Sequence, residues 1–262
     1  MDLHLTDKVA VVTGAGRGIG LAVTQALANE GACVVAASRT PTEPLSELAA
    51  RKDVHFVQAD LTEPDGSAEP VEEAVARFGG LDILVNNVGA VRPRAGGFLS
   101  VGDDDWMWAM TVNFLTAVRT TRAALPHLIK GGSGSIVTVS SVTAFLPDPS
   151  VIDYCASKAA LTNFCKALSK EAGPQGVRVN TVSPGPVATD LWLGEGGIAA
   201  TVAATDGTAP DTVAQEFAAQ AVTGRFTRPE EVADLVVLLA SGRSGNVTGS
   251  DFVIDGGLIT TL

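Results

Sequence analysis

Residues 9–20 read VAVVTGAGRGIG, an apolar run followed by glycine at positions 14, 16, 18 and 20. The run has the composition of a buried strand, and the side chains of Ile19, Val23, Ala26 and Leu27 follow at the spacing of a helix core face. Glycine is needed where the backbone turns sharply and approaches a ligand closely, and free N–H groups at a helix start attract phosphate. The stretch therefore predicts a strand, a phosphate-binding turn and a helix. Its spacing departs from G-x-G-x-x-G, and such a turn can also serve only to close a strand onto a helix.

Short apolar runs of the same kind recur along the chain, with helical stretches between them. Together with the first run they lie at residues 9–13, 33–37, 54–57, 82–85, 135–139, 177–182 and 252–254. Seven strands that alternate with helices predict a single Rossmann-type, doubly wound α/β domain across residues 1–262, with a seven-stranded parallel sheet, right-handed crossovers and helices on both faces. The composition, 46% hydrophobic and 5% aromatic, suits a sheet core of Val, Ile, Leu and Ala.

Several helices have clear end signals. The first predicted helix ends at Gly31, a favourable C-cap residue. The helix that holds Tyr154 has an N-cap and a first-turn proline at residues 148–149 and a Gly-Pro stop at residues 173–174. A further long helix is expected over residues 103–125.

The alternation of strands and helices breaks down late in the chain. Between Pro186 and Arg225 the sequence turns to Gly, Ala and Thr with scattered large apolar residues. A long segment of this kind in a compact domain is usually a functional lid or a mobile segment. The sequence therefore predicts a weakly structured substrate lid at about residues 188–224.

Charge and composition exclude several classes of function. The formal net charge is −11, so the clustered Lys and Arg that nucleic acid binding needs are missing. The N-terminal residues include acids and no apolar leader, and the longest apolar run, residues 235–240, is too short to span a bilayer; a soluble cytoplasmic protein is expected. Three cysteines without C-x-x-C spacing and three histidines far apart predict free thiols and no metal.

The end of the second predicted strand indicates which dinucleotide the chain prefers. An acid at this position bonds the adenosine ribose of NADH, but here the strand ends in Ser38 and Arg39. Ser38 can hydrogen-bond a 2′-phosphate, and Arg39 can neutralise it with help from Arg17. The pattern favours NADPH over NADH. The alternative is that these are ordinary solvated arginines.

Tyr154 is the only tyrosine in the chain, and Lys158 follows it by four positions on the predicted helix. Residues four apart on a helix share a face. A cation a few Å from a phenol favours phenolate and can lower the phenol pKa by ~1 to 3 units from ~10, which would make Tyr154 a usable proton donor. An isolated Tyr and Lys at this spacing can also be a chance surface pair.

These features together resemble the classical short-chain dehydrogenase/reductase family, and the resemblance covers essentially the whole chain. The matching motifs occur in the family's order: TGAGRGIG at 13–20, DL at 60–61, NNVG at 86–89, Asn113, SS at 140–141, YCASK at 154–158 and PGPVAT at 184–189. Ser141 lies thirteen positions before Tyr154, and Asn113 lies forty-one before it, where the family places its other catalytic residues.

The resemblance implies a role for each catalytic position. Tyr154 protonates a carbonyl oxygen as hydride arrives, and Ser141 hydrogen-bonds the same oxygen. Lys158 lowers the phenol pKa and binds the nicotinamide ribose. Asn113, in a helix distortion, holds a water in a proton relay.

The resemblance also implies a set of cofactor contacts. Asp60 would contact the adenine edge, Asn87 and Gly89 the adenosine side, and Val187 and Thr189 the nicotinamide amide. The full set is Gly14, Arg17, Gly18, Ile19, Gly20, Ser38, Arg39, Asp60, Leu61, Asn87, Gly89, Tyr154, Lys158, Pro184, Gly185, Val187 and Thr189. Plainer interpretations are that Asn86 and Asn87 tie strands together and that Asp60 forms a turn.

The segments after the fourth, fifth and sixth strands should build the substrate pocket. They carry an apolar set that predicts a substrate with an apolar body and one reducible ketone: residues 91–94, residues 142–147, Trp192, Leu193, Ile198 and Phe217. Alternatively, Trp192 and Phe217 anchor the insert to the core.

Rival functions stay open at this point. An acidic carrier protein with a 3-oxoacyl group would need a basic rim, for which Arg92 and Arg94 are the candidates. An NAD-dependent alcohol dehydrogenase is a second alternative, and a non-catalytic dinucleotide sensor is a third. Family members are commonly homotetramers, so a homo-oligomer is expected.

Overall fold

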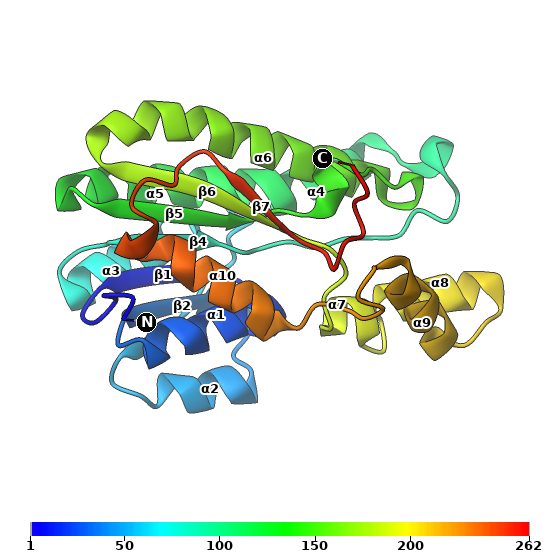
Figure 1. Ribbon diagram of the computed structural model, residues 1–262, viewed down its shortest axis with the longest axis horizontal. Helices are drawn as coiled ribbons and strands as arrows, with labels where there is room; N and C mark the ends of the chain where they lie inside the picture. The colour runs from blue at the N-terminus through cyan, green and yellow to red at the C-terminus, as the bar shows by residue number, and fades with distance from the viewer. Residues whose placement is uncertain (1, 262) are drawn as a thin grey trace.

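The computed structural model describes residues 2–261, apart from the side chain of Asp206, and is built on a central sheet (Figure 1). All seven strands are parallel, in the order β3-β2-β1-β4-β5-β6-β7. They are β1 (Val9–Thr13), β2 (Cys33–Ser38), β3 (Val54–Gln58), β4 (Ile83–Asn86), β5 (Gly134–Val139), β6 (Val177–Pro184) and β7 (Asp251–Ile254). The seven predicted strands are confirmed, and β6 runs two residues beyond its predicted end at residue 182.

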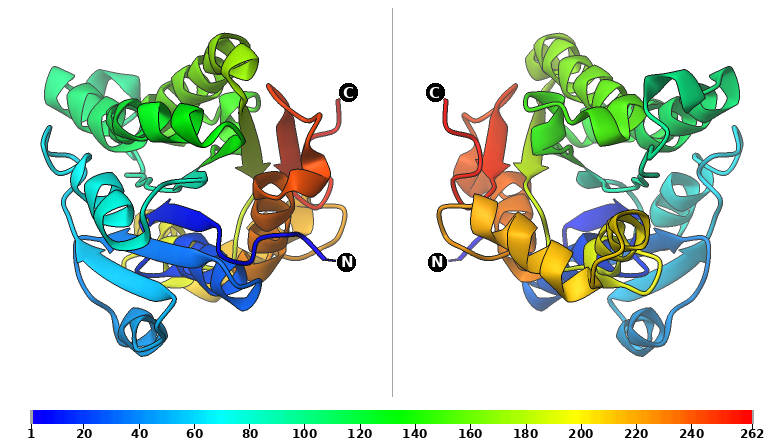
Figure 2. Two further views of the ribbon diagram at one scale, coloured as in Figure 1. Left: turned by 90° about the vertical axis from the view of Figure 1, so that its left-hand side faces the viewer. Right: turned by 90° about the vertical axis from the view of Figure 1, so that its right-hand side faces the viewer.

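Helices cover both faces of the sheet. Alternate strand residues point to opposite sides, and in β1 both sets of side chains are apolar and buried. Ala10 and Val12 of β1 pack with one helix layer, α1 (Gly18–Asn29), α2 (Glu43–Ala49) and α10 (Pro229–Ala240). Val9 and Val11 pack with the other layer, α3 (Glu69–Phe78), α5 (Thr116–Gly131) and α6 (Ile152–Ala172). Figure 2 shows the two layers on either side of the strands. The sheet is therefore buried on both faces, as the aliphatic composition predicts.

The order of the strands places a crevice beside β1. The chain runs from β1 outward to β2 and β3, then returns to β4 on the other side of β1. In an open parallel sheet, a ligand binds outside the carboxyl ends of the strands at such a switch point. The glycine loop after β1 and the chain after β4 form the two sides of this crevice.

The predicted helix ends hold with small differences. Gly31 follows α1 with a φ of +84°, which glycine adopts without strain. Asp148 accepts a hydrogen bond from the Ser150 N–H, but the first turn, Pro149–Val151, is a 3-10 turn and α6 begins at Ile152. The end predicted at residue 125 is wrong: α5 continues past Pro126 to Gly131, because fully buried Leu128 anchors its last turns.

The insert is more ordered than the sequence predicts. It forms three helices, α7 (Asp190–Leu193), α8 (Ile198–Asp206) and α9 (Pro210–Gln220), which lie beyond the carboxyl ends of the strands (Figure 1). Alanine favours helix, and proline suits the first turn of α9. The rings of Trp192 and Phe217, with centroids 4.9 Å apart, join α7 to α9. These contacts supply the order that the local sequence does not suggest.

No helix within residues 2–261 is long and apolar enough to cross a membrane. Among the same residues, no group of three or more His, Cys, Asp or Glu side chains could hold a metal ion.

Candidate active site

The glycine loop has backbone geometry that excludes larger residues. Gly14 and Gly18 have φ values of +65° and +55°, in the left-handed region. A Cβ on Gly20 would lie 2.2 Å from the Gly14 carbonyl oxygen, and one on Gly16 would lie 2.7 Å from the Ser38 Oγ. Arg17 is the N-cap residue of α1, and its side chain makes no hydrogen bond to the start of the helix. The backbone N–H groups of the first turn of α1 can therefore bind a phosphate. The loop therefore fits a dinucleotide.

Almost all of the predicted site residues line one cleft of about 990 Å³ at the carboxyl ends of the strands. Gly20 and Asn113 are the exceptions, because both lie buried behind the cleft wall. The predicted residues that line it are Gly14, Arg17, Gly18, Ile19, Ser38, Arg39, Asp60, Leu61, Asn87, Gly89, Ser141, Tyr154, Lys158, Pro184, Gly185, Val187 and Thr189.

The end of the cleft beside β2 carries two exposed cations. Arg17 and Arg39 are exposed, and neither forms an ion pair with another residue in the range 2–261. Asp60 accepts hydrogen bonds from the Thr62 N–H and hydroxyl, and these, with the charge of Arg39, lower the pKa of the Asp60 carboxyl. Asp60 thus forms a turn, as the plainer interpretation expected, and also lines the cleft.

Asn87 ties strand ends together, as the plainer interpretation proposed, and Asn86 ties β4 to both β5 and α5. The Asn87 Nδ2 donates to the Thr13 carbonyl at 3.0 Å and to the Gly14 carbonyl at 3.2 Å. The Asn86 Nδ2 donates to the hydroxyls of Thr121 and Thr138. The side-chain amide of Asn87 therefore holds the glycine loop against the end of β4.

Asn113 is fully buried in a π-helical turn, Thr111–Leu115, which connects α4 (Asp103–Met110) to α5. Its Nδ2 donates to the Ala90 carbonyl at 2.9 Å, and its Oδ1 accepts from the Ala90 N–H at 2.9 Å. A Cβ on Gly89 would lie 3.3 Å from both the Asn113 Oδ1 and the Lys158 Nζ. The expected helix distortion is therefore present as this π-helical turn, and Asn113 hydrogen-bonds from it to the loop after β4, next to Lys158.

Ser141 lies at the end of β5 and caps a 3-10 turn, Val142–Ala144. Its Oγ accepts a hydrogen bond from the Thr143 N–H at 3.2 Å and another from the Thr143 hydroxyl at 2.9 Å. With both lone pairs of the Oγ occupied, the Ser141 hydroxyl is left to donate into the cleft. Thr143 lies in the segment predicted to line the substrate pocket, but its two bonds to Ser141 were not foreseen, although a serine two residues before a threonine at a strand end is a signal of such a turn.

Tyr154 and Lys158 lie on the same side of α6, and both line the cleft. The Lys158 Nζ is 5.7 Å from the centroid of the Tyr154 ring. It is buried and donates a hydrogen bond to the Val139 carbonyl at 2.9 Å. The shared face that the spacing predicts is confirmed.

The other end of the cleft is mostly apolar. Predicted residues that line it are Val91, Pro93, Val142, Thr143, Leu146, Pro147, Trp192, Ile198 and Phe217, joined by Trp108, Val112, Val202 and Leu258, which the sequence did not indicate. Trp192 and Phe217 pack on each other and line the cleft, so both interpretations of the pair hold.

Five residues expected at the substrate end do not line the cleft: Arg92, Arg94, Ala144, Phe145 and Leu193. Leu193 is exposed outside it. The Arg92 guanidinium lies 3.7 Å from the centroid of the Trp108 ring, and Arg94 is turned away into ion pairs with Asp105 and Asp153. Cation–π contact and burial in ion pairs explain these positions. Of the two arginines expected at a basic rim, Arg94 is neutralised by its ion pairs, whereas Arg92 is exposed and has no ion pair within residues 2–261.

Known proteins of similar sequence and structure share this architecture. The family model described as enoyl-(acyl carrier protein) reductase matches residues 14–259. The 3-oxoacyl-(acyl carrier protein) reductase FabG of Thermotoga maritima is 34% identical over 262 residues, which cover 98% of this chain and 100% of the relative. The short-chain reductase protein NovJ of Streptomyces niveus is 35% identical over 255 residues, covering 96% of this chain and 94% of the relative.

A solved structure agrees along the whole length. L-sorbose reductase from Gluconobacter frateurii, in complex with NADPH and L-sorbose, is 33% identical, with a TM-score of 0.91 and coverage of 100% of both chains. The chain belongs to the short-chain dehydrogenase/reductase family. It is an oxidoreductase that interconverts carbonyl and alcohol groups with a nicotinamide dinucleotide.

In this short-chain dehydrogenase/reductase, burial sets the protonation of the two central side chains. It raises the pKa of Tyr154 from 10.0 to about 12, and an interaction with Ser141 offsets only part of the shift. It lowers the pKa of Lys158 from 10.5 to about 8. The phenol pKa is therefore raised overall, not lowered as the sequence predicts, because desolvation is the largest effect; that Lys158 stabilises the phenolate stays a prediction.

Tyr154 is half-buried at the cleft wall, and because it is the only tyrosine, the desolvation of its phenol can be tested directly. At about pH 10, where an exposed phenol is half ionised, the folded protein should show almost no tyrosinate absorbance, and the denatured protein should show about half of the maximum. Because the folded pKa of Tyr154 exceeds the unfolded one, the associated stabilisation is complete below pH 10.0 and is lost as the pH rises towards about 12. Circular dichroism checks that the protein is folded. Equal absorbance in the two states would contradict the burial.

Proposed function

We propose that this protein reduces a ketone to a secondary alcohol with NADPH, or catalyses the reverse reaction, through Ser141, Tyr154, Lys158 and Asn113. The observation that carries the proposal is that the two hydroxyls and the ammonium line the same cleft as the glycine loop. A dinucleotide at the loop and a carbonyl group at the hydroxyls would therefore share one cavity. When bound, the nicotinamide supplies the hydride.

The role of each cleft side chain follows from its surroundings. Tyr154 holds its proton near neutral pH and can donate it to the carbonyl oxygen as negative charge develops there. Ser141, whose lone pairs are taken by Thr143, donates a hydrogen bond to the same oxygen. Lys158 remains mostly protonated near neutral pH, and its charge stabilises the phenolate that the proton transfer leaves.

Asn113 supports this set from behind the cleft. Its two hydrogen bonds to Ala90 fix the loop that passes Lys158 at Gly89. The water-holding role that the resemblance implies stays a prediction.

The protonation state of Tyr154 favours reduction at neutral pH. Reduction begins with a protonated phenol, whereas oxidation of an alcohol needs phenolate as the base. A phenol with a pKa of about 12 is almost entirely protonated at neutral pH. Alcohol oxidation should therefore gain much more than ketone reduction from a rise in pH.

Exposed positive charge supports NADPH as the preferred cofactor. Arg17 and Arg39 border the cleft with Ser38, and the solved relative from Gluconobacter frateurii holds NADPH. A 2′-phosphate carries negative charge that these two guanidinium groups can bind. An NAD-dependent alcohol dehydrogenase is the alternative that this charge disfavours.

The apolar end of the cleft supports a free ketone with an apolar body as the substrate. The competing proposal is a 3-oxoacyl group on acyl carrier protein, which the name of the Thermotoga maritima relative favours. Against it, Arg94 is held in ion pairs, so exposed Arg92, stacked on Trp108, is the only one of the two candidate rim cations left for an acidic carrier.

Other parts of the proposal concern the whole molecule. We propose one domain over residues 1–262, in which residues 188–224 cover the apolar end of the cleft, as the positions of Trp192, Ile198 and Phe217 support. A homotetramer, which light scattering would test, and a cytoplasmic location stay predictions.

Replacing Tyr154 with Phe tests the chemistry. The Tyr154→Phe variant keeps the ring but loses the proton, so kcat for NADPH-dependent ketone reduction should fall by about 10²- to 10⁴-fold while NADPH affinity is retained. A panel of ketones, followed by NADPH oxidation, is the assay. Ser46→Ala, which removes a hydroxyl outside the cleft, is the control. Full turnover by Tyr154→Phe would remove the phenol from the mechanism, whereas a wild-type protein that turns over no ketone of the panel would favour a dinucleotide sensor.

The charge beside β2 should decide between the two dinucleotides. Arg39→Asp should shift the ratio of kcat/KM values towards NADH by about tenfold or more, because an acid repels the 2′-phosphate and can bond the ribose. Arg77→Asp makes the same change of charge on exposed α3, outside the cleft, and should leave the ratio unchanged. An unchanged ratio in Arg39→Asp would argue against NADPH preference through this residue.

A comparison of two forms of one substrate separates the free ketone from the carrier-bound one. A 3-oxoacyl thioester of a small thiol and the same acyl group on acyl carrier protein should give kcat/KM values within about tenfold of each other, because Arg94 is neutralised and the single exposed Arg92 attracts an acidic carrier only weakly. A much higher value for the carrier form, reduced by added salt, would support the carrier reductase instead.

A further inference from the structure

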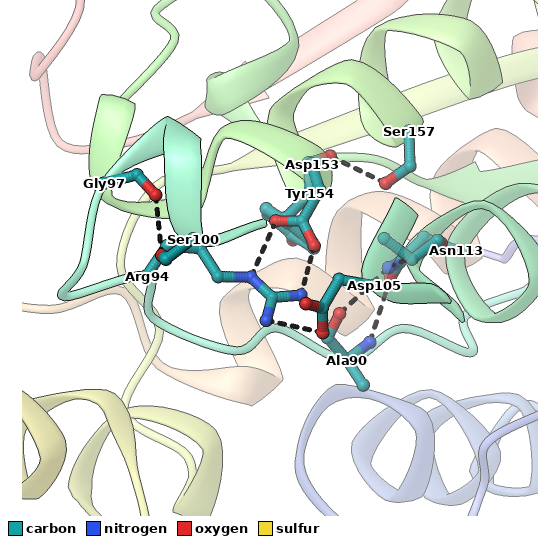
Figure 3. Close-up of polar contacts among 10 residues, drawn as sticks. Ala90, Arg94, Gly97, Ser100, Asp105, Asn113, Asp153, Tyr154 and Ser157 are labelled. Carbon is teal, nitrogen blue, oxygen red and sulfur yellow. Dashed lines mark hydrogen bonds and ion pairs between the residues drawn. The ribbon is translucent and has the colours of Figure 1, made fainter. Parts of the chain in front are cut away.

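Arg94 forms the centre of an ion cluster that the proposed chemistry does not use. Its Nε and Nη2 bond the two carboxylate oxygens of Asp153, and its Nη1 bonds the Asp105 Oδ1 at 2.8 Å (Figure 3). The Asp153 side chain is 2% exposed and the Arg94 side chain 11%. A guanidinium is planar and presents its donors in a fixed fork, so two carboxylates at its edges set its orientation.

The cluster joins three segments that are far apart in the sequence. Arg94 belongs to the loop after β4, Asp105 to α4 and Asp153 to the first turn of α6. The Arg94 N–H also donates to the Ser150 carbonyl at 2.7 Å, so backbone and side chain both fasten the loop to the start of α6. The same loop is bonded to Asn113 at Ala90.

The position of Asp153 gives the cluster its functional meaning. Asp153 directly precedes Tyr154, and Figure 3 shows the two side by side at the start of the helix. Arg94 does not line the cleft, so any effect on the reaction must pass through the residues that it contacts, of which Asp153 is next to Tyr154. Removing two charges from water is costly, and an apolar pair of similar size is often as stable, so an ion pair this buried is weak grounds for a role in stability alone.

We propose that Arg94 is a positioning residue: through Asp153 it fixes the first turn of α6, and with it the Tyr154 hydroxyl, relative to the loop that carries Gly89 and Ala90. This inference rests on the proposed function of Tyr154. A fixed hydroxyl matters because proton donation needs a donor within hydrogen-bond reach of the carbonyl oxygen, and a misplacement of ~1 Å can cost about 10²-fold in rate.

Two variants of the full-length protein test the proposal. Arg94→Lys keeps the charge but loses the fork, and Asp153→Asn keeps the shape but loses the charge. Each should lower kcat for ketone reduction by about tenfold to a hundredfold, with KM for the ketone and the NADPH dissociation constant changed by less than about threefold. The solvent isotope effect on kcat should rise, because proton transfer becomes slower than the other steps.

A second readout does not depend on activity. Tyr154 is the only tyrosine, so tyrosinate absorbance at about pH 10 reports on this side chain alone. If Arg94 holds the start of α6, both variants should show more tyrosinate than the wild type while circular dichroism shows them folded, because a loosened Tyr154 is better hydrated. Asp105→Asn breaks only the more exposed arm of the cluster and should have a smaller effect in the same direction.

Arg178 provides a matched control. It lies at the amino end of β6, away from the cleft, and its guanidinium bonds the Leu239 carbonyl at 2.9 Å and the Ser241 carbonyl at 3.0 Å, at the end of α10. Arg178→Lys loses a bonded fork as Arg94→Lys does. It should lower Tm but leave kcat and the tyrosinate absorbance unchanged.

The outcomes separate positioning from stability. The proposal is overturned if Arg94→Lys and Asp153→Asn have the kcat of the wild type. It is also overturned if their kcat falls no further than that of Arg178→Lys when the loss of Tm is equal. Loss of NADPH affinity equal to the loss of kcat also overturns it, because the whole cleft has then collapsed. A wild-type protein that turns over no ketone refutes the proposed function instead, and unchanged tyrosinate absorbance in both variants then refutes the positioning role separately.

Discussion

The Asn87 side chain joins the ends of β1 and β4, the two neighbouring strands at which the order of strands along the chain reverses. Its amide donates to the carbonyls of Thr13 and Gly14, while its backbone N–H donates to the Thr13 Oγ1 at 2.9 Å. Strand ends at a switch point have diverging connections and no further ladder partners. These bonds keep the glycine loop and the loop after β4 at a fixed separation, and the width of the cleft depends on that separation.

The chemistry of the cleft follows from how it is enclosed. Desolvation keeps Tyr154 protonated and lowers the pKa of Lys158 to about 8. The two hydrogen bonds from Thr143 occupy the lone pairs of the Ser141 Oγ, so Ser141 can act only as a hydrogen-bond donor. All three groups therefore present donors or positive charge to one place. A place of this kind stabilises an oxygen that becomes negative, which is what carbonyl reduction requires. The walls beyond it are apolar and aromatic, so they add shape without competing charge.

The loop after β4 links the parts of the site that come from different elements. It is bonded to Thr13 and Gly14 through Asn87, to the π-helical turn through Ala90 and to the start of α6 through Arg94. The loop thus contacts the elements that carry the glycine loop, Asn113 and Tyr154. Hydrogen bonds on three sides restrict the movement of this loop, and the loop in turn supports the functional side chains on the elements that it joins.

Local patterns in the sequence predicted the elements, because strand and helix periodicity and glycine turns act over a few residues. The seven strands were located to within two residues, and the motif resemblance placed Ser141, Tyr154 and Lys158, which all line the cleft. The helical insert was not foreseen, because its order depends on Trp192 meeting Phe217. The continuation of α5 past Pro126 was also not foreseen, because it depends on the burial of Leu128.

By itself, then, the sequence determined the fold class and indicated the side chains that we propose to be reactive. Only the tertiary structure decided their protonation states and hydrogen-bond partners. The pKa of Tyr154 depends on how completely the rest of the chain excludes water from it, and spacing along one helix gives no measure of that exclusion. Arg94, read from the sequence as a rim cation, instead meets Asp153, 59 positions away, because the fold brings the loop after β4 against the start of α6.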